Sequence, residues 1–452
     1  MFWRTKSHDS HASQDPALAR TASASKNDPA ASADQASGTA WLAGHLNHLT
    51  PEQEEKLREF KSVCSERGYY TEAVEEGEGV EAKEPSHDDA TMLHGANRTD
   101  DAIPARSQVR GRGAWGQFKD TEDWRKDNAI ESLYANIGVD SYEAARRMYP
   151  QWTGRRDRRG IPVYVFEIRH LDNKEMAAYN NTMSTGTPET HKSSTIPARL
   201  LNLFALYENL LNFVMPLCSA LPRPNPETPI VTSTNIVDVS GVGLKQFWNL
   251  KSHMQDASVL ATAHYPETLD RIFIIGAPAF FPTVWGWIKR WFDPVTTSKI
   301  FILSAAEVKP TLTSFMEPSS IPKQYGGELE WQWGEMPHLD EPAQELLKGL
   351  EQEPAEGQTR KGLLKGPVLF KGDVVEVLGT EDGKDRRATI PVPQSELKFN
   401  GQTETETEKE SSTETANGDA ESNAAPAAEN EKPIENVAVN VSEEARTTNV
   451  AV

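Results

Sequence analysis

The chain has 452 residues, of which 37% are apolar and 25% are charged. Its 47 lysines and arginines stand against 67 aspartates and glutamates, and the resulting net charge of −20 excludes a nucleic-acid binder that depends on a general basic field. Two cysteines, Cys64 and Cys218, are too few for a disulfide framework and predict a reducing, cytosolic compartment.

The N-terminal part of the chain divides into a polar segment and a helical one. Residues 1–40 are rich in Ser, Ala and Asp and contain no apolar run of signal-peptide length, so we predict disorder and no secretion signal. Residues 41–135 predict a small helical domain, interrupted near residues 75–113. Its clearest start signal is Thr50 followed by Pro51, an N-cap residue and a first-turn proline.

Between residues 140 and 330, apolar segments of strand length alternate with helical segments. Strands are expected at 161–168, 230–239, 271–275 and 299–303, and helices at 198–214, 244–262 and 283–291. This alternation predicts an α/β domain with a largely parallel sheet. The most apolar helix carries Asn202, Glu208 and Asn212, which are costly inside a bilayer, so we expect no transmembrane helix.

The C-terminal part is less regular. Residues 331–399 form an extension in which 368–377 and 388–392 are expected as two short strands that flank residues 379–385 in an appended hairpin. Residues 400–452 predict an acidic disordered tail, since 401–452 hold twelve acidic and three basic residues in a Thr-, Glu- and Ala-rich sequence.

Most enzymatic signatures are absent or weak. The chain contains neither a GxxxxGK[ST] nor an HExxH pattern, and the GxGxxG match at 111–116 follows no good strand. No metal or cofactor is therefore expected. Ser240, in a turn that resembles a nucleophile elbow without its first glycine, could in principle combine with His264 in an esterase. A strand that ends and turns into a helix explains the same residues more simply.

Residues 280–292 hold six large aromatic side chains. A helix of this composition needs apolar contact on more than one side. It is either a buried core helix or a lid that faces an apolar cavity on one side and lipid on the other. Lys289 and Arg290 among the tryptophans suit a membrane interface. The hydroxyls and the lysine of the following segment, 293–299, could bind a phosphate or could simply cap a strand.

Six short motifs follow one another between residues 149 and 327. They are Tyr149-Pro150-Gln151, Gly160-Ile161-Pro162-Val163-Tyr164, His264-Tyr265-Pro266-Glu267, Phe273-Ile274-Ile275-Gly276-Ala277-Pro278, Asp293-Pro294-Val295-Thr296-Thr297-Ser298-Lys299-Ile300 and Pro322-Lys323-Gln324-Tyr325-Gly326-Gly327. In this order and spacing the chain resembles the CRAL-TRIO lipid-binding family, in its fungal secretory-pathway phosphatidylinositol and phosphatidylcholine transfer type.

The resemblance implies a fold and a set of site residues. It implies a CRAL-TRIO lipid-binding domain, with a mixed, largely parallel sheet, flanking helices and a gated apolar pocket for one phospholipid, preceded by a small all-α domain. The gating helix would carry Phe280, Phe281, Trp285, Ile288, Trp291 and Phe292. The inositol-phosphate headgroup would be contacted by Asp157, Glu267, Thr296 and Lys299. Choline-lipid positions are retained at Tyr164 and Ser233.

The chain departs from the family pattern at two places. Thr153, Asn235 and Ala261 replace other residues at choline-lipid positions, so inositol-lipid binding is expected more firmly than choline-lipid binding. Residues 94–106 lack a helical apolar period where the family has a basic, aromatic helix, which puts the headgroup contact of that helix's arginine in doubt.

The resemblance implies phospholipid binding and transfer between membranes, without covalent chemistry. The protein would be a cytoplasmic monomer, bound transiently to the surface of Golgi or endosomal membranes. The alternative is a lipid sensor or adaptor that presents its lipid to a kinase or regulates membrane traffic; the esterase, and a different apolar ligand such as a sterol or haem, are further alternatives.

Overall fold

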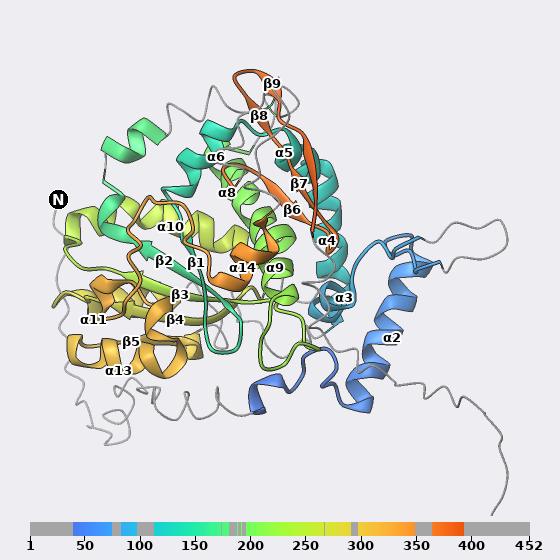
Figure 1. Cartoon of the computed structure of the whole chain (residues 1–452), viewed down its shortest axis with the longest axis horizontal. Coiled ribbons are helices and arrows are strands. Elements are labelled where there is room, and N and C mark those ends of the chain that lie inside the picture. The colour runs from blue at the N-terminus through green and yellow to red at the C-terminus, as the bar shows by residue number, and fades with distance from the viewer. Residues whose placement is uncertain are drawn as a thin grey trace, which may run out of the picture. The chain divides into compact units, whose positions relative to one another are not determined.

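A five-stranded sheet forms the centre of the molecule. The structure is a computed structural model, and it describes residues 39–74, 83–96, 113–172, 174–179, 188, 191, 196–265, 267–290, 297–348 and 364–392 (Figure 1). The strands are β1 (Gln151–Arg156), β2 (Pro162–Glu167), β3 (Ser233–Asp238), β4 (Leu269–Ile275) and β5 (Ile300–Ile302). They lie in this order; β1 pairs antiparallel with β2 and every later pair is parallel. The predicted mixed, largely parallel sheet is confirmed.

Helices connect the parallel strands. They are α8 (Ala198–Asn209), the π-helical turn η5 (Leu210–Val214) and α9 (Met215–Ala220) between β2 and β3, α10 (Leu244–His264) between β3 and β4, and α11 (Phe281–Ile288) between β4 and β5. The sequence predicts one regular helix over 198–214, but η5 widens its last turn. Pro216 explains the wider turn, because it has no N–H to donate back and its ring crowds the preceding turn.

Alternating strand residues cover the two faces of the sheet. Val163 and Ile236 pack with α13 (Ala305–Phe315) and with the segment that ends at Trp331. Phe166 and Ile274 lie in the next row of the sheet, one position after Ile236 in register, and they pack toward α8, α10 and α11 on the other face. This two-residue alternation places a helical layer on each side of the sheet. Three further short helices are η3 (Ile168–His170), η6 (Pro318–Ser320) and η7 (Lys323–Tyr325).

Strand β1 is not predicted from the sequence. Its polar residues give no apolar alternation, yet Gln151 and Thr153 are completely buried. Gln151 accepts a hydrogen bond from the backbone N–H of Gly334 at 2.9 Å, and Thr153 donates to the carbonyl of Val163 at 3.1 Å. Partners outside the strand therefore satisfy the Gln151 side-chain oxygen and the Thr153 hydroxyl, two polar groups that mislead a local prediction.

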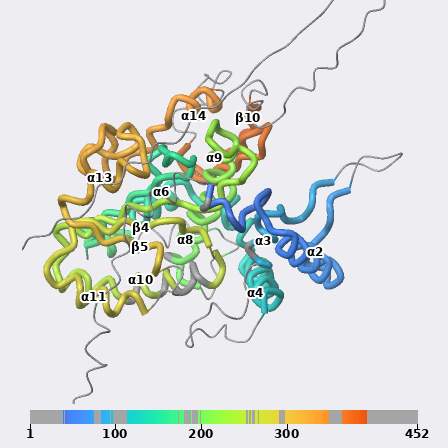
Figure 2. The backbone as a smooth tube through the Cα atoms, turned by 90° about the horizontal axis from the view of Figure 1, so that it is seen from below, coloured from blue at the N-terminus to red at the C-terminus, as the bar shows by residue number. Residues whose placement is uncertain are grey.

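The N-terminal helices are η2 (Ala40–Leu42), α2 (Pro51–Glu66), α3 (Asp89–Ala96), α4 (Ala114–Asp127), α5 (Ile130–Asn136) and α6 (Val139–Arg146). Helices α2, α3 and α4, which lie together in Figure 2, share a small core of their own, whereas α5 and α6 pack against α8. Thr50 caps α2 in a reciprocal capping box with Gln53, which confirms the predicted start of that helix. Phe60 and Phe118 meet edge to face, with ring centroids 5.6 Å apart. The small all-α part that precedes the sheet is thus confirmed.

The C-terminal extension is part of the main fold. It contains α14 (Glu341–Leu346), β6 (Val368–Phe370), β7 (Val374–Val377), β8 (Thr380–Glu381), β9 (Lys384–Asp385) and β10 (Ala388–Pro391). Strands β10, β7 and β6 form an antiparallel sheet, and β8 pairs with β9 as a hairpin. The predicted strand at 388–392 is confirmed by β10, but the single strand expected over 368–377 is divided into β6 and β7, which pair with each other. Their packing against Trp152, Phe213 and Leu217 is not foreseen from the sequence, because it depends on contacts far along the chain.

The helix over Leu200–Ala220 is long and apolar enough to span a membrane by length and composition alone. Two thirds of its most apolar stretch is buried inside the fold. Asn202 and Glu208 are also buried, and Glu208 is paired with Arg125. These features are typical of the core helix of a globular domain.

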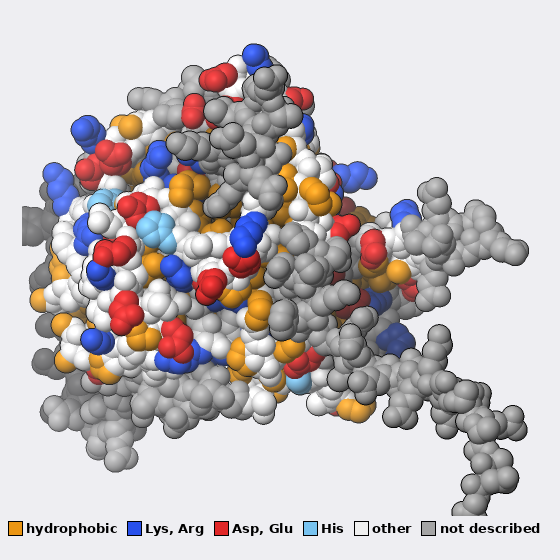
Figure 3. Space-filling model, in the orientation of Figure 1, with side chains coloured by type: hydrophobic (Ala, Val, Ile, Leu, Met, Phe, Trp, Pro, Cys, Tyr) orange, Lys and Arg blue, Asp and Glu red, His pale blue; other side chains and the backbone are white. Residues whose placement is uncertain are grey.

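The exposed surface mixes charges of both signs. On the face drawn in Figure 3, acidic and basic side chains are interspersed between apolar ones over the described part of the chain. The expectations for residues 1–38 and for the acidic tail after residue 400 lie outside the described residues, as do Trp291, Phe292, Thr296 and the side chain of Ala261.

Tyr134 connects the C-terminal sheet to the body of the protein. Its buried hydroxyl donates to the carbonyl of Val368 at 2.7 Å and accepts from the N–H of the same residue at 2.9 Å. We expect Tyr134→Phe to lower the free energy of unfolding by about 2–3 kcal/mol, because both backbone groups are left buried without a partner. Chemical denaturation measures this loss.

Tyr207→Phe is the matched control for Tyr134→Phe. Tyr207 is also tightly packed and stacks on Tyr265, but no hydrogen bond of its hydroxyl is found among the described residues. Tyr207→Phe should lower the free energy of unfolding by less than about 1 kcal/mol. Equal losses in the two variants would contradict an anchoring role of the Tyr134 hydroxyl.

Candidate functional site

Four predicted site residues lie at one edge of the sheet, where the parallel strands begin. Asp157 is in the loop between β1 and β2, and Ser233 is the first residue of β3. Glu267 lies two residues before β4, and Lys299 directly precedes β5. Because the parallel strands start at the same edge, residues far apart in the sequence are brought together there. Thr296, the fifth polar candidate, lies outside the described residues.

Lys299 and Glu267 form a partly exposed ion pair at this edge. The Lys299 Nζ atom is 3.3 Å from Glu267 Oε2 and donates to the carbonyl oxygen of Leu269 at 2.9 Å. About half of the Glu267 side chain is exposed (49%). Its backbone has a φ of 56°, a left-handed conformation that is uncommon outside glycine. The pair therefore presents an ammonium group and a carboxylate to solvent, which can bind phosphate and hydroxyl groups.

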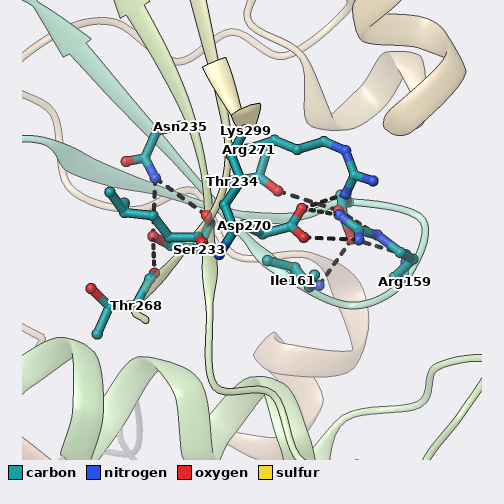
Figure 4. A network of polar contacts seen from close by, with 11 residues as sticks. Arg159, Ile161, Ser233, Thr234, Asn235, Thr268, Asp270, Arg271 and Lys299 are labelled. Atoms are coloured by element: carbon teal, nitrogen blue, oxygen red, sulfur yellow. Dashed lines mark hydrogen bonds and ion pairs between the residues drawn. The ribbon is translucent and has the colours of Figure 1, made fainter. Parts of the chain in front are cut away.

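A buried ionic network lies beside this pair (Figure 4). The Arg159 guanidinium contacts Asp157 Oδ2 at 2.7 Å and Asp270 Oδ1 at 3.2 Å. Asp157 also accepts hydrogen bonds from the backbone N–H groups of Arg159 and Ile161 and from the Thr234 hydroxyl. The Asp157 carboxylate is fully buried, so its contacts lie within the protein.

The charges of this network hold each other in their ionised forms. Burial lowers the pKa of Arg159, but the adjacent Asp157 and Asp270 carboxylates outweigh burial and raise it above its usual value. Burial likewise raises the pKa of Asp270, and the attraction of Arg159 outweighs this effect, so that the pKa lies below its usual value. Arg159 and Asp270 are therefore both charged at neutral pH.

The family resemblance points to Asp157, Glu267 and Lys299 as site residues, and it does not point to Arg159 and Asp270, which the structure places beside them. Arg158 and Arg159 are adjacent and have the same local signal, yet Arg159 is 5% exposed while the Arg158 side chain points outward to Glu317. Only the path of the loop after β1 determines that Arg159 points inward and Arg158 outward. A pair of arginines between an aspartate and a glycine before a strand is a signal for a loop, not for an ionic network.

A tyrosine-lined cavity lies next to this edge. Its volume is about 120 Å³, and it is bordered by residues of α6, β1, β2, α8, η5, β3 and the start of β4. Tyr164 and Ser233, the two predicted choline-lipid positions, line it together with Asn235. Asn235 donates from Nδ2 to Ser233 Oγ at 3.0 Å. Thr153 is not among the lining residues.

The tyrosine hydroxyls of the cavity are neutral. Burial raises the pKa of Tyr142 and Tyr164 well above the usual value, and it raises that of Tyr207 to about 12. The cavity thus offers neutral hydroxyl and amide groups between apolar walls. This composition suits an uncharged polar group attached to hydrocarbon.

The cavity is too small in this conformation for a phospholipid. Ligand pockets usually measure about 300–1,000 Å³, and the resemblance implies a pocket that encloses both acyl chains. Instead, apolar side chains fill the space between the cavity and α11. Phe281, Val284 and Ile288 of α11 are buried against this cluster, and Phe280 and Trp285 are partly buried. Among the described residues, none of those that line the cavity belongs to α11.

The esterase alternative is contradicted by the structure. Ser240 precedes α10 and His264 is its last residue, so a helix of 21 residues, about 30 Å long, separates them. Ser240 lies against Gly276, where a Cβ atom would overlap its hydroxyl. His264 stacks on Trp124 at 3.9 Å between ring centroids. The turn at Ser240 is the strand end that the simpler interpretation predicts.

A second depression, about 820 Å³, lies between the N-terminal helices and α9. Arg125 and Glu208 form a two-pronged ion pair there, with N–O distances of 2.7 and 2.9 Å. Tyr265 donates to Glu208 at 2.9 Å. This buried pair joins α4 to α8 and thereby attaches the helical part to the sheet domain.

His264, beside this ion pair, makes stability depend on pH. Burial and the positive charge of Arg125 lower the pKa of His264 from 6.5 to about 4. The unfolded chain therefore binds a proton at a higher pH than the folded chain. The contribution of His264 is fully present above pH 6.5 and is lost as pH falls toward 4. Allowing for its partial exposure, we expect a loss of about 1–2 kcal/mol in unfolding free energy.

His264→Phe tests this dependence, since it keeps a flat ring against Trp124. When both proteins are denatured at several pH values in this range, the unfolding free energy of the variant should change less steeply with pH than that of the unchanged chain. His45, whose pKa burial also lowers, accounts for part of the slope that remains. An unchanged slope would exclude His264 as the source.

Comparisons with known proteins agree with this architecture. Residues 146–327 match the model of the CRAL/TRIO domain family. The chain is 26% identical over 289 residues to a SEC14 cytosolic factor of Kluyveromyces lactis, covering 64% of this chain and 82% of the relative. It is 28% identical over 285 residues to that of Yarrowia lipolytica, covering 63% of this chain but only half (50%) of the relative.

A plant relative and a solved structure also match. A protein of Arabidopsis thaliana named phosphatidylinositol/phosphatidylcholine transfer protein SFH7 is 29% identical over 244 residues, covering 54% of this chain and 40% of the relative. The crystal structure of Sfh5 has 16% identity and a TM-score of 0.35, covering 53% of this chain and 77% of that one. Residues 146–327, which contain the five-stranded sheet, thus form a CRAL/TRIO domain, and the chain is similar to Sec14-type proteins.

Proposed function

We propose that this protein binds one phospholipid and transfers it between membranes, with phosphatidylinositol as the favoured lipid and phosphatidylcholine as a second one. Sec14-type CRAL/TRIO proteins are lipid-transfer proteins and not enzymes. The names of the plant relatives refer to both lipids, and those of the fungal relatives refer to cytosolic factors. We accordingly propose a cytoplasmic monomer that contacts membranes transiently.

The observation that carries this proposal is the continuity between the exposed ion pair and the cavity. Thr268 and Leu269 line the cavity, and the Leu269 carbonyl holds the Lys299 ammonium group. A phosphate bound by Lys299 would therefore lie at the rim, with its lipid directed inward. Glu267 would accept hydrogen bonds from inositol hydroxyls. Asp157 would act indirectly, by holding Arg159 and the loop that carries it.

Energetics require the apolar core to take part in lipid exchange. Two acyl chains of about 30 methylenes oppose transfer into water by roughly 24 kcal/mol. No headgroup contact offsets a cost of this size. We propose that α11 moves away at a membrane, so that acyl chains replace the apolar side chains packed between α11 and the cavity. Contacts among side chains are then exchanged for contacts with lipid, and the headgroup site determines which lipid stays.

Choline lipids would bind less tightly at this site. Tyr164 and Ser233 line the cavity, but the Asn235 amide donates to the Ser233 hydroxyl and carbonyl. A choline headgroup offers no donor to replace this contact, and it would have to displace the amide. Inositol hydroxyls offer both donors and acceptors. This difference supports the preference for phosphatidylinositol.

Native mass spectrometry of the purified protein tests the proposal. We expect a co-purified adduct with the mass of one phosphatidylinositol and a smaller population with phosphatidylcholine. A sterol or haem adduct instead would contradict it. Transfer between vesicles by protein that ends at residue 400 would distinguish a carrier from an adaptor that needs its acidic tail.

A further inference from the structure

Two exposed tryptophans lie side by side on neighbouring helices. Trp248 of α10 is 55% exposed and Trp287 of α11 is 40% exposed. Their rings meet edge to face with centroids 5.8 Å apart. The two helices lie next to each other at one end of the sheet (Figure 2). Leu244, 51% exposed, is one turn from Trp248 on α10. Three of the five large apolar side chains that are exposed in the described part of the chain are therefore gathered in one patch.

These tryptophans are not misplaced core residues. On α10 the neighbouring Phe247 and Leu250 are buried against the sheet, whereas Leu244, Trp248 and Lys251 follow the opposite, i, i+4, i+7 face. A soluble protein that leaves a contiguous apolar surface exposed usually uses it for binding. The patch also costs solubility, which a purely structural role of α10 does not require.

The charge around the patch is positive in an otherwise acidic protein. Residues 241–251 and 281–290 contain Lys245, Lys251, Lys289 and Arg290 and no acidic residue, while the whole chain has a net charge of −20. The Lys251 Nζ atom lies 5.0 Å from the centre of the Trp248 ring. Indole rings between basic groups are favoured at the headgroup level of a bilayer, and lysines there are attracted to anionic lipids.

We propose that Trp248, Trp287 and Leu244, surrounded by Lys245, Lys251, Lys289 and Arg290, form the surface on which this protein docks to an anionic lipid bilayer. This inference deepens the proposed function, since it names the docking surface that a carrier needs. It adds a contribution of α10 to that of α11. Docking through both helices places the moving helix in the headgroup layer while the sheet domain remains outside.

Vesicle flotation of the full chain tests the surface. The probes are phosphatidylcholine vesicles with and without phosphatidylserine. We expect Trp248→Ala to weaken binding to both kinds of vesicle by about tenfold. The variant lacks the exposed half of the indole ring, which in the unchanged chain would be transferred from water into the bilayer. Lys251→Gln should weaken binding by about fivefold on the phosphatidylserine vesicles alone, and added salt should reproduce its effect. Trp248→Tyr should restore most of the binding.

Matched variants outside the patch serve as controls. Ile302 is a comparably exposed apolar residue (42%), and Lys56 is an exposed lysine on α2. Ile302→Ala and Lys56→Gln should bind both kinds of vesicle as the unchanged chain does. Trp248→Ala should keep its thermal midpoint, because Trp248 is not part of the core.

Two results would overturn the inference. One is unchanged binding of Trp248→Ala to anionic vesicles. The other is a dimer of the unchanged chain in sedimentation that Trp248→Ala abolishes without an effect on vesicle binding, which would assign the patch to a second copy of the chain. The mass of the co-purified lipid separates this test from the proposed function. If vesicle binding depends on Trp248 but no phospholipid co-purifies with the protein, the docking surface is supported and the proposed lipid-transfer function is contradicted.

Discussion

Arg159→Met is expected to lower the free energy of unfolding by about 3–5 kcal/mol, because it leaves the Asp157 and Asp270 carboxylates buried without their cation. Methionine fills a similar volume, so the loss comes mainly from charge and hydrogen bonding. Urea denaturation at neutral pH measures it. The difference from the unchanged chain should narrow as the pH falls, because the attraction of Arg159 that lowers the pKa of Asp270 is lost in the variant.

Arg158→Met is the matched control for this prediction. Arg158 is the adjacent arginine, its side chain is 45% exposed, and its partner Glu317 is exposed as well. Its loss should cost at most about 1 kcal/mol. Adding Asp270→Asn to Arg159→Met should recover part of the stability, since one of the two unpaired charges is removed. Similar losses at positions 158 and 159 would refute a buried network.

Lys299→Ala is expected to reduce phosphatidylinositol transfer by about 10- to 100-fold while the protein stays folded. The lysine offers a charge-assisted hydrogen bond to phosphate, and such bonds contribute about 1.5–3 kcal/mol. Its existing partner Glu267 is half exposed, so stability should fall by no more than about 1 kcal/mol. Transfer of labelled phosphatidylinositol between vesicles, with a parallel thermal melt, measures both effects.

Lys323→Ala is the control for Lys299→Ala, since Lys323 is an exposed lysine paired with the exposed Glu330. It should transfer phosphatidylinositol as the unchanged chain does. Phosphatidylcholine exchange should suffer less than phosphatidylinositol transfer in Lys299→Ala, because the inositol headgroup also engages Glu267. Unchanged transfer of both lipids would remove Lys299 from the headgroup site.

Local patterns were sufficient for the parallel part of the sheet. The apolar run at 161–168 contains strand β2, and the run at 271–275 matches the last five residues of β4, because a strand buried on both faces needs a continuous apolar sequence. The aromatic run predicted a helix at 283–291, and α11 spans Phe281–Ile288. This helix has a buried face and an exposed face: Val284 and Ile288 face the core, and Trp287, part of the docking patch, faces solvent.

Elements with polar residues or distant partners could not be found in this way. Gln151 of strand β1 is held by the N–H of Gly334, which lies 183 residues away and is in no window of sequence around the strand. The position of β6 depends on a hydrogen bond from the Tyr134 hydroxyl, which lies more than two hundred residues earlier in the chain. A polar side chain that is buried and satisfied looks the same in the sequence as one that is exposed.

By itself the sequence determined the chemistry available at the candidate site, a lysine, carboxylates and hydroxyls beside apolar strands, and the family from which their roles were inferred. Tertiary structure alone decided that Lys299 meets Glu267, that Arg159 is enclosed between two aspartates while Arg158 is exposed, and that Trp248 meets Trp287. The physical reason is that hydrophobic periodicity is a local property of the chain, whereas charge pairing and exposure depend on which distant segments the folded strands bring to one edge.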